Sequence, residues 1–573
     1  MLEATLEPSA HTIAVKAVVQ LPAAESPRDV EFLLAAPLRI VTSEPAVERL
    51  PATKNSAFAG INGSSAAITD SGNAQRYRVR LPAGATRIAL EYQGPIDFGF
   101  ESPAQEYARG FNETAGTIRD DGIYLAGSTL WYPYLGETLF TFELQAKAPE
   151  GWQLISPGSG SARAADGVAR WKSATPVDEL HIVGGKLRRY ARPAGAVTAE
   201  VFLRQADDAL AAKYLEATVR NLEMYRTLIG PYPYDKFALV ENFWETGYGM
   251  PSFTLLGPQI IRFPFILTSS YPHEILHNWW GNGVFVDYAR GNWCEGLTAY
   301  LADHLYKEQL GQGAEYRRDT LKKYRDFVRD SQDFPLTAFR SRHSPATEAV
   351  GYGKALMLDH MLRRRVGDAA YVRGLQRFFR EQRGKRASFD DLARAHGAAA
   401  GVDLLPMVEQ WVSHVGAPDL RVADVRVTRE AQRYVVRGVL RQAQDRPFDL
   451  DVPVVLRSKQ GVTQHVVTLH GNRTTFELAS DTAPIALEID PEFDLFRLLD
   501  ARETAPSLGQ MFGEGEVLAV LPAKAPPAFV QAYRDMLQFW SGGGAQKFRI
   551  VTDAAAVTLP TDRAVWVLGA DNA

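Results

Sequence analysis

The chain has 573 residues, 46% of them hydrophobic, and a formal net charge of −4 at pH 7. This length implies several domains, and the hydrophobic content is sufficient for well-packed cores. The slightly negative charge gives no electrostatic argument for a nucleic-acid partner, and the single cysteine, Cys294, excludes an intramolecular disulfide and is expected to be a buried, inert thiol.

Residues 1–192 alternate short β-like runs with turn signals, as in Thr12–Val19 and Tyr77–Leu81. We predict that they form a β-rich N-terminal domain. No segment approaches the ~20 apolar residues that span a bilayer, and the first residues lack the basic and apolar regions of a signal peptide. The chain is therefore expected to be soluble, and either cytoplasmic or, if a leader has been removed, periplasmic or secreted.

A helical period begins near Ala209, where apolar residues follow one stripe until Gly230 and Pro231 end the pattern. The strand Phe237–Val240 and several further helices follow. We therefore predict a second domain over residues 193–416, with a small strand part and then a mostly helical part.

The segment from His273 to His277, His-Glu-Ile-Leu-His, most limits what the chain can be. Residues four apart lie on the same face of a helix, so the two histidines can direct their imidazoles at one metal ion. Glu295, at the start of a second predicted helix, supplies a third ligand. Two histidines and one glutamate leave the fourth position of tetrahedral zinc open to water, as in catalytic rather than structural sites. We predict one Zn²⁺ per chain.

Glu274, beside the first ligand, is the predicted general base. Zinc lowers the pKa of a bound water to about 7, and the Glu274 carboxylate can accept that proton and later donate it to the leaving nitrogen. The alternative is a chance motif on an amphipathic helix, which does not account for a suitably placed Glu295 in the next helix. The sequence therefore predicts a zinc peptidase that acts on a peptide or protein substrate.

These residues resemble the aminopeptidase N and leukotriene hydrolase group of gluzincins, in which the motif is followed by an aromatic-Gly-Asn segment and then Glu-Gly. The matching residues are Trp280-Gly281-Asn282 and Glu295-Gly296. The family usually has one residue more than the seventeen that separate His277 from Glu295 here, and we expect a shortened loop around 288–291 to absorb the difference. The resemblance implies a multidomain α+β fold with a saddle-like β-rich first domain, a thermolysin-like zinc domain and aminopeptidase activity.

Val350–Leu356 resembles the family segment that carries a tyrosine at the zinc site, although Gly353 stands where the family commonly has Glu. By this resemblance, the phenol of Tyr352 would donate a hydrogen bond to the oxyanion formed at the attacked carbonyl. The alternative for Tyr352 is a packed aromatic ring with its hydroxyl at the surface.

The family's exopeptidase signature is Gly-x-Met-Glu-Asn, in which the Glu holds the free amino group of the substrate. Gly249 and Met250 match this signature, but Pro251 and Ser252 occupy the positions of Glu and Asn. A proline side chain cannot bind an ammonium ion. The family's reason for cutting only at the amino terminus is therefore not visible in this segment.

Glu241 or Glu245, just upstream, could replace the missing anchor, or both could be surface carboxylates at the end of a strand. The expected function is a zinc-dependent aminopeptidase. An endopeptidase, a hydrolase of another small substrate and a non-catalytic scaffold that kept the fold remain alternatives. The sequence does not indicate the oligomeric state.

Alternation of period two returns after Gly416, as in Tyr434–Leu440, and predicts a small β-sandwich over residues 417–500. Residues 501–573 combine the strand Val517–Leu521 with a helix and further strands, which predicts an α/β segment. Because this segment stops just after a strand, we expect the natural protein to continue beyond it.

Overall fold

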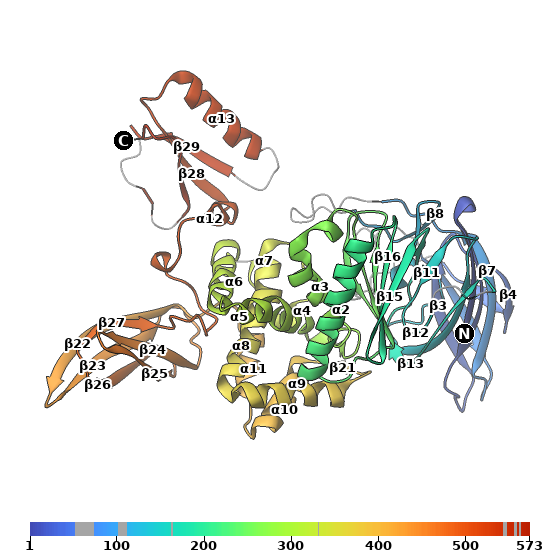
Figure 1. The fold of residues 1–573 in the computed structure, drawn as a ribbon, viewed down its shortest axis with the longest axis horizontal. Coiled ribbons are helices and arrows are strands. Elements are labelled where there is room, and N and C mark those ends of the chain that lie inside the picture. The colour runs from blue at the N-terminus through green and yellow to red at the C-terminus, as the bar shows by residue number, and fades with distance from the viewer. Residues whose placement is uncertain are drawn as a thin grey trace. The chain divides into compact units, whose positions relative to one another are not determined.

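The computed structural model describes residues 1–51, 74–100, 112–161, 164, 166–329, 332–541, 547–554, 559–560 and 563–572 (Figure 1). The chain forms two compact units. Unit 1 comprises Met1–Tyr306 and Val366–Pro406, and unit 2 comprises Lys307–Arg365 and Met407–Ala573. In the described part of the chain, no helix is both long and apolar enough to cross a membrane.

Unit 1 begins with a β-rich region, which confirms the predicted character of the N-terminal part. Its seven-stranded sheet has the order β12-β13-β10-β1-β2-β7-β4, and buried and exposed residues alternate along β1 and β2 because successive side chains point to opposite faces. The strands of this sheet are β1 (Leu2–Glu7), β2 (Thr12–Gln20), β4 (Arg39–Glu44), β7 (Arg87–Pro95), β10 (Phe140–Lys147), β12 (Ser159–Ser161) and β13 (Val168–Val177).

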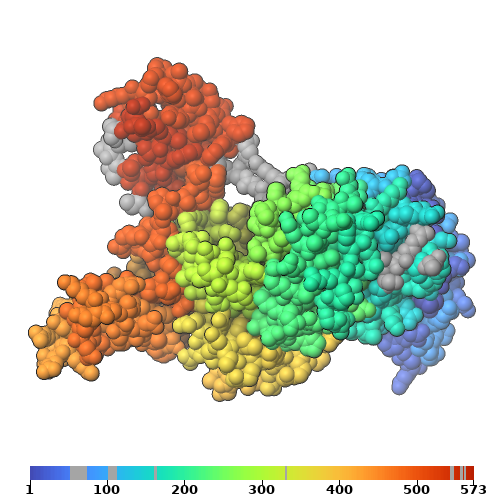
Figure 2. Space-filling view, viewed as in Figure 1, coloured from blue at the N-terminus to red at the C-terminus, as the bar shows by residue number. Residues whose placement is uncertain are grey.

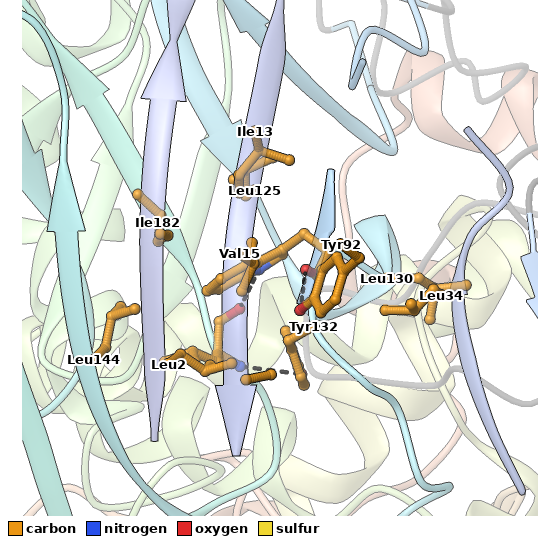
Figure 3. Packing of buried hydrophobic residues seen from close by; sticks show 14 of the residues in the cluster. Leu2, Ile13, Val15, Leu34, Tyr92, Leu125, Leu130, Tyr132, Leu144 and Ile182 are labelled. Atoms are coloured by element: carbon orange, nitrogen blue, oxygen red, sulfur yellow. Dashed lines mark hydrogen bonds between the residues drawn. The ribbon is translucent and has the colours of Figure 1, made fainter. Parts of the chain in front are cut away.

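Two smaller sheets complete this region, in the orders β11-β14-β9-β8 and β3-β6-β5. Their buried faces share one apolar cluster with the large sheet, and Figure 3 shows Leu2, Val15 and Leu144 from adjacent strands within it. The strands are β3 (Arg28–Ala35), β5 (Val47–Arg49), β6 (Ala74–Leu81), β8 (Gly116–Arg119), β9 (Gly122–Leu125), β11 (Gln153–Ile155) and β14 (Ile182–Gly185).

A five-stranded sheet, β15-β16-β17-β19-β18, follows in the chain. The parallel pair β16 and β17 is joined by helix α2 (Asp208–Leu228), whose N-cap Asp207 accepts a hydrogen bond from the backbone N–H of Leu210 at 2.9 Å. Helix α2 packs on β15 and β16, and its outer side is part of the teal-green surface in Figure 2. The strands are β15 (Arg188–Ala194), β16 (Val197–Leu203), β17 (Lys236–Glu241), β18 (Gly247–Met250) and β19 (Phe253–Leu256).

The remaining elements of unit 1 are mostly helical. Three tryptophans, Trp279, Trp280 and Trp293, are fully buried where the helices meet. The short pair β20 (Phe285–Val286) and β21 (Arg386–Ala387) joins the two chain segments of the unit. The helices are η4 (Ile260–Arg262), η5 (Pro264–Thr268), α3 (Ser270–Leu276), η6 (Tyr288–Arg290), α4 (Cys294–Ala299), the π-helix η7 (Tyr300–His304), α9 (Asp368–Gln382) and α10 (Phe389–Ala400).

Unit 2 contains helices, two three-stranded antiparallel sheets and a parallel sheet. The antiparallel sheets, β22-β23-β26 and β25-β24-β27, lie within residues 420–489. The parallel sheet has the order β29-β28-β30 and carries helix α13 (Pro527–Ser541) between β28 and β29. The strands are β22 (Leu420–Glu430), β23 (Arg433–Gln442), β24 (Leu450–Ser458), β25 (Gly461–Leu469), β26 (Arg473–Ser480), β27 (Pro484–Ile489), β28 (Glu516–Leu521), β29 (Lys547–Thr552) and β30 (Val565–Val567).

The helices of unit 2 include one continuous stretch in which α7 (Pro345–Glu348), the π-helix η10 (Ala349–Lys354) and α8 (Ala355–Val366) follow without a break. Tyr352 therefore lies inside a helical stretch and not ahead of it. Helices α5 (Leu305–Gln309), α8 and α11 (Leu405–Ser413) cross the unit boundaries, and α6 (Gly313–Phe327), η9 (Leu336–Ala338), η11 (Ala501–Glu503) and α12 (Leu508–Phe512) lie within unit 2.

Candidate metal centre

Three ligand side chains converge in unit 1. Helix α3 carries His273 and has His277 as its C-cap residue, α4 carries Glu295, and the three ligand atoms lie within 4.8 Å of one another. Oε2 of Glu295 is 3.5 Å from Nε2 of His273 and 3.6 Å from Nε2 of His277. Tetrahedral zinc with bonds of about 2.0–2.1 Å requires ligand atoms about 3.3 Å apart. The three side chains therefore fit a zinc ion with little rearrangement.

The other ring nitrogen of each histidine is also engaged. Nδ1 of His273 lies 2.9 Å from Oδ2 of Asp303, and Nδ1 of His277 lies 3.1 Å from the carbonyl oxygen of Trp280. An acceptor at Nδ1 keeps a proton there and leaves the Nε2 lone pair free for a metal. Both Nε2 atoms face Glu295, so these contacts select the tautomer that a zinc site needs.

Asp303 was not predicted from the sequence. It follows Glu295 by eight residues, and in a regular α-helix this spacing would turn its side chain about 80° away from that of Glu295. The π-turn η7 widens the helix between Tyr300 and His304, and both carboxylates contact the ring of His273. The sequence does show an acidic residue about two turns after Glu295. It does not show the π-turn that directs this residue toward His273.

Cys294 was predicted to be a buried, inert thiol. It is buried, but its Sγ lies 3.4 Å from Nδ1 of His277 and 3.8 Å from Oγ1 of Thr298. The predicted burial is therefore confirmed, and the thiol also has two polar contacts. Placement directly before Glu295 brings the thiol onto the ligand histidine, which sequence neighbours alone did not indicate.

The electrostatics of the site follow from burial and from these pairs. Burial lowers the pKa of His273, but Asp303 and Glu295 raise it more, to about 9. Burial raises the pKa of Glu295, yet the two histidines hold it well below its usual range. Burial also raises the pKa of Glu274. The site therefore combines an ionised ligand carboxylate with a second carboxylate that accepts a proton more readily than an exposed glutamate.

Glu274 rests against the edge strand β18. A Cβ atom at Gly249 would lie 2.3 Å from Oε2 of Glu274, so a larger residue here would displace this carboxylate from its position. The next residue, Met250, is fully buried and packs in an apolar cluster with Phe253 and Trp244. The structure thus brings Gly249 to the predicted base, whereas Met250 belongs to the core.

Pro251 and Ser252 form the two-residue turn between β18 and β19, where Met250 pairs with Phe253. Proline fixes a negative φ at the first turn position, and Ser252 has φ 68° at the second, as in a type II turn. The second position favours Gly or Asn, so serine is an uncommon residue at this left-handed position. Pro251 is a turn residue and offers no group for an amine.

The two alternative anchors are engaged elsewhere in the fold. Oε1 of Glu241 accepts a hydrogen bond from Nη1 of Arg262 at 2.7 Å, and Oε2 accepts one from the backbone N–H of Arg204 at 2.8 Å. Its side chain is 3% exposed, so Glu241 is not a surface carboxylate. The strand register places Glu241 two strands and two residues from Gly249, so their Cα atoms are about 12 Å apart. Because Gly249 is the residue that contacts the Glu274 carboxylate, the structure does not bring Glu241 to Glu274.

Glu245 is half-buried. Its Oε1 accepts a hydrogen bond from the backbone N–H of Gln259 at 2.8 Å, and its Oε2 lies against Gly257, where a Cβ would be only 2.2 Å away. These contacts hold the carboxylate at the start of β18, at the end of the strand opposite to Met250.

Tyr352 lies on η10 in unit 2. Its ring makes an edge contact with Phe339, with centroids 6.0 Å apart, and the guanidinium carbon of Arg342 lies 5.4 Å from its ring centroid. The ring is half-buried. These contacts fix the orientation of the phenol on its own helix.

Residues 267–411, which include all three ligands, match the peptidase family M1 domain. Aminopeptidase 2, mitochondrial, of Saccharomyces cerevisiae is 25% identical over 220 residues, which cover 37% of this chain and 23% of that protein. Aminopeptidase N of Escherichia coli is 26% identical over 202 residues, which cover 33% of this chain and 23% of that protein. The chain therefore matches about a quarter of the length of these relatives.

Among solved structures, the M1 zinc metallopeptidase of Deinococcus radiodurans has a TM-score of 0.54 and 18% sequence identity. The similarity covers 72% of this chain and 92% of that one, which establishes the shared fold. A point mutant of that protein has been solved with a Tyr-Ser-Ala substrate. The match of residues 267–411 to the peptidase family M1 domain, together with these relatives, confirms the resemblance to the aminopeptidase N group.

Proposed function

We propose that this protein is a zinc-dependent peptidase, and specifically an aminopeptidase that holds one zinc ion per chain. The observation that carries the proposal is the convergence of His273, His277 and Glu295 beside the half-buried carboxylate of Glu274. The aminopeptidase subclass follows the relatives, several of which are named aminopeptidases.

The bound zinc would lower the pKa of a water molecule to about 7 and polarise the scissile carbonyl. Glu274 accepts the proton of the attacking water at its carboxylate and then donates it to the leaving nitrogen. Its pKa, raised by burial, suits both directions of this transfer. Asp303 holds the proton on Nδ1 of His273, and Gly249 leaves space for the Glu274 carboxylate.

By its resemblance to the family, Tyr352 is assigned to donate a hydrogen bond from its phenol to the oxyanion. A preorganised donor of this kind contributes about 10²–10³ in kcat. Tyr352→Phe keeps the ring contacts with Phe339 and Arg342 and removes only the hydroxyl, so it tests this role directly.

A second candidate function is an endopeptidase on the same centre. Pro251 occupies the position of the family's amine anchor, and both oxygens of Glu241 are bound within the protein. An enzyme without an amine anchor has no structural reason to require a free amino terminus.

The proposal is tested with paired peptides that are identical except for a free or an acetylated amino terminus. Zinc-loaded wild-type protein and Glu274→Gln are compared, and products are read by mass spectrometry. We expect Glu274→Gln to retain zinc and to lose turnover by at least about a thousandfold, because no other described group takes over the proton transfer.

Release of one residue from the free peptide alone supports the aminopeptidase. Internal cleavage of both peptides supports the endopeptidase. Zinc-loaded protein whose cleavage is unaffected by Glu274→Gln, or that cleaves neither peptide, contradicts the peptidase proposal.

A further inference from the structure

Lys236, the first residue of β17, carries a buried ammonium group. It is 4% exposed, and its Nζ donates to Oγ of Ser252 at 2.7 Å and to the carbonyl oxygen of Ser156 at 2.8 Å. Both acceptors are neutral, and burial lowers the pKa of Lys236 to about 8, although the carboxylates of Glu200 and Asp235 act in the opposite direction. Burying a cation is costly, and the two hydrogen bonds of Nζ to Ser252 and Ser156 are the direct contacts that offset part of this cost.

Its partner Ser252 is the residue with positive φ in the β18–β19 turn. Ser252 is fully buried at φ 68°, a conformation that L-residues other than Asn rarely adopt. Three hydrogen bonds hold it there. Besides the bond from Lys236, its backbone N–H donates to Oδ1 of Asn278 at 2.7 Å, and its carbonyl oxygen accepts from the backbone N–H of Ala238 at 3.0 Å.

Asn278 connects this turn to the helix of the general base. Its Nδ2 donates to the carbonyl oxygen of Ile275 at 2.9 Å and lies 3.4 Å from that of Glu274, while its Oδ1 accepts from Ser252. Gly249, three residues before Ser252, contacts the Glu274 carboxylate. The turn is therefore linked to Glu274 in two ways. Asn278 connects it to the backbone carbonyl of Glu274, and Gly249, on the adjoining strand, contacts the Glu274 side chain.

We propose that Lys236 and Ser252 are positioning residues for the general base, because their hydrogen bond holds the left-handed turn that sets Gly249 against the carboxylate of Glu274. This inference rests on the proposed peptidase function. Neither Lys236 nor Ser252 is hydrogen-bonded to His273, His277 or Glu295 among the described residues. Their proposed effect is therefore on the position of the base and not on the metal ligands.

The kinetic test uses three variants. Lys236→Met keeps an unbranched side chain of nearly the same length and removes its donor, and Ser252→Ala removes the acceptor. Each should lower kcat about tenfold, with KM changed less than about twofold and zinc content unchanged, because a small displacement of a catalytic group costs rate more than binding.

The double variant Lys236→Met with Ser252→Gly separates positioning from packing. Glycine adopts φ near 68° without strain, so the turn no longer needs the hydrogen bond. We expect the double variant to recover most of the kcat that Lys236→Met loses. A lysine that served only to fill space would gain nothing from glycine at position 252.

A second readout needs no turnover. Hydrogen–deuterium exchange of the peptide Gly247–Leu256, measured on metal-free protein, should become faster in Lys236→Met and return toward wild type in the double variant. Lys354 is the matched control, because it is also buried and donates to a carbonyl oxygen, that of His414 at 2.5 Å. Lys354→Met should leave the exchange of Gly247–Leu256 unchanged.

A lower kcat and faster exchange in Lys236→Met, both of which return toward wild type in the double variant, support the inference. Unchanged kcat and exchange in Lys236→Met, or no recovery in the double variant, overturns it. If wild-type protein shows no Glu274-dependent turnover, the proposed function fails, and the exchange measurement still decides whether Lys236 and Ser252 hold the turn.

Discussion

At the residue scale, one hydrogen bond prepares His273 for metal binding. The carboxylate of Asp303 holds a proton on Nδ1 at 2.9 Å, so Nε2, which faces Glu295, is the nitrogen left to bind a metal. The same carboxylate makes the imidazole a stronger base, and such outer partners are typically worth 10–100-fold in metal affinity. Asp303 thus contributes to the centre without touching the metal.

Asp303→Ala should therefore weaken zinc binding by about 10–100-fold, because the ring of His273 loses both its tautomer control and its orientation. Competition with a chromophoric chelator at constant pH measures the change. Asp29→Ala, which removes an exposed carboxylate paired with Arg80, is the control and should bind zinc as wild type does. Equal affinities of the Asp303 and Asp29 variants would contradict the assigned role.

Gly249→Ala tests the space beside the base. The added Cβ would lie 2.3 Å from Oε2 of Glu274 and 3.4 Å from Cδ2 of His277, so it displaces the carboxylate and barely touches the ligand. We expect kcat to fall about 10–100-fold with zinc affinity retained. At Gly247, in the same strand, a Cβ meets nothing within 4 Å, so Gly247→Ala should keep full activity. Similar kcat values for the two variants would show that the contact at Gly249 does not matter.

The sequence predicted those features of the site that arise from local periodicity. Two histidines four apart share a helix face in any regular helix, and Glu274 between them must lie next to the ligands. The pairing of Glu241 with Arg262 could not be predicted, because it depends on where a later loop folds back onto β17. For the same reason, local sequence indicated neither the bond between Lys236 and Ser252 nor the contact of Cys294 with His277.

At the element scale, two π-turns mark the helices that carry functional candidates. The turn η7 holds Asp303 and the turn η10 holds Tyr352, and in each case α-helical segments precede and follow the π-turn without a break. π-turns carry a cost in hydrogen-bond geometry and occur frequently at functional sites. Apolar periodicity predicts the helix around such a turn but not the extra residue inside it.

Gly351 shows how η10 is packed. A Cβ at this position would lie 2.1 Å from Cε2 of Phe339, the ring that also contacts Tyr352. Gly351→Ala should therefore destabilise the protein by about 1–3 kcal/mol, as overpacking of a close contact does. Urea unfolding measures this change, and Gly515→Ala is the control because a Cβ there meets nothing within 4 Å. A stability loss no larger than that of the control would mean that η10 adapts freely.

At the scale of the whole molecule, the β-rich start of the chain was predictable because alternation of period two reports a half-buried strand directly. Which residues make up each of the two compact units was not predictable. Unit 1 takes up Val366–Pro406 after the chain has left it at Tyr306, and nothing in the helical pattern around Val366 signals that return. Contacts such as the pairing of Phe285 with Arg386 create this arrangement, and they join residues far apart in sequence.

Metal binding, protonation and stability should be linked across the whole molecule. In metal-free protein the pKa of His273 is raised from 6.5 to about 9, so this group stabilises the fold fully below pH 6.5 and loses that contribution as pH rises through 9. Zinc needs the neutral imidazole and must displace the proton, so its affinity should rise by up to about tenfold per pH unit across the same range.

We therefore expect opposite pH trends. The contribution of His273 to the stability of the metal-free protein should fall as pH rises, whereas the stabilisation by zinc should grow. The zinc-induced increase in Tm should grow from pH 6 to pH 8, because the ligand stabilises in proportion to RT ln(1 + [Zn]/Kd) and Kd falls as pH rises. Calorimetric titration in two buffers of different ionisation enthalpy counts the protons, and at pH 7 about one or more should be released per zinc bound. Asp303→Ala, which lacks the carboxylate that raises the pKa of His273, should release fewer. A zinc affinity that stays constant between pH 6 and pH 8 would contradict the coupling, because it would mean that His273 is already neutral before the metal arrives.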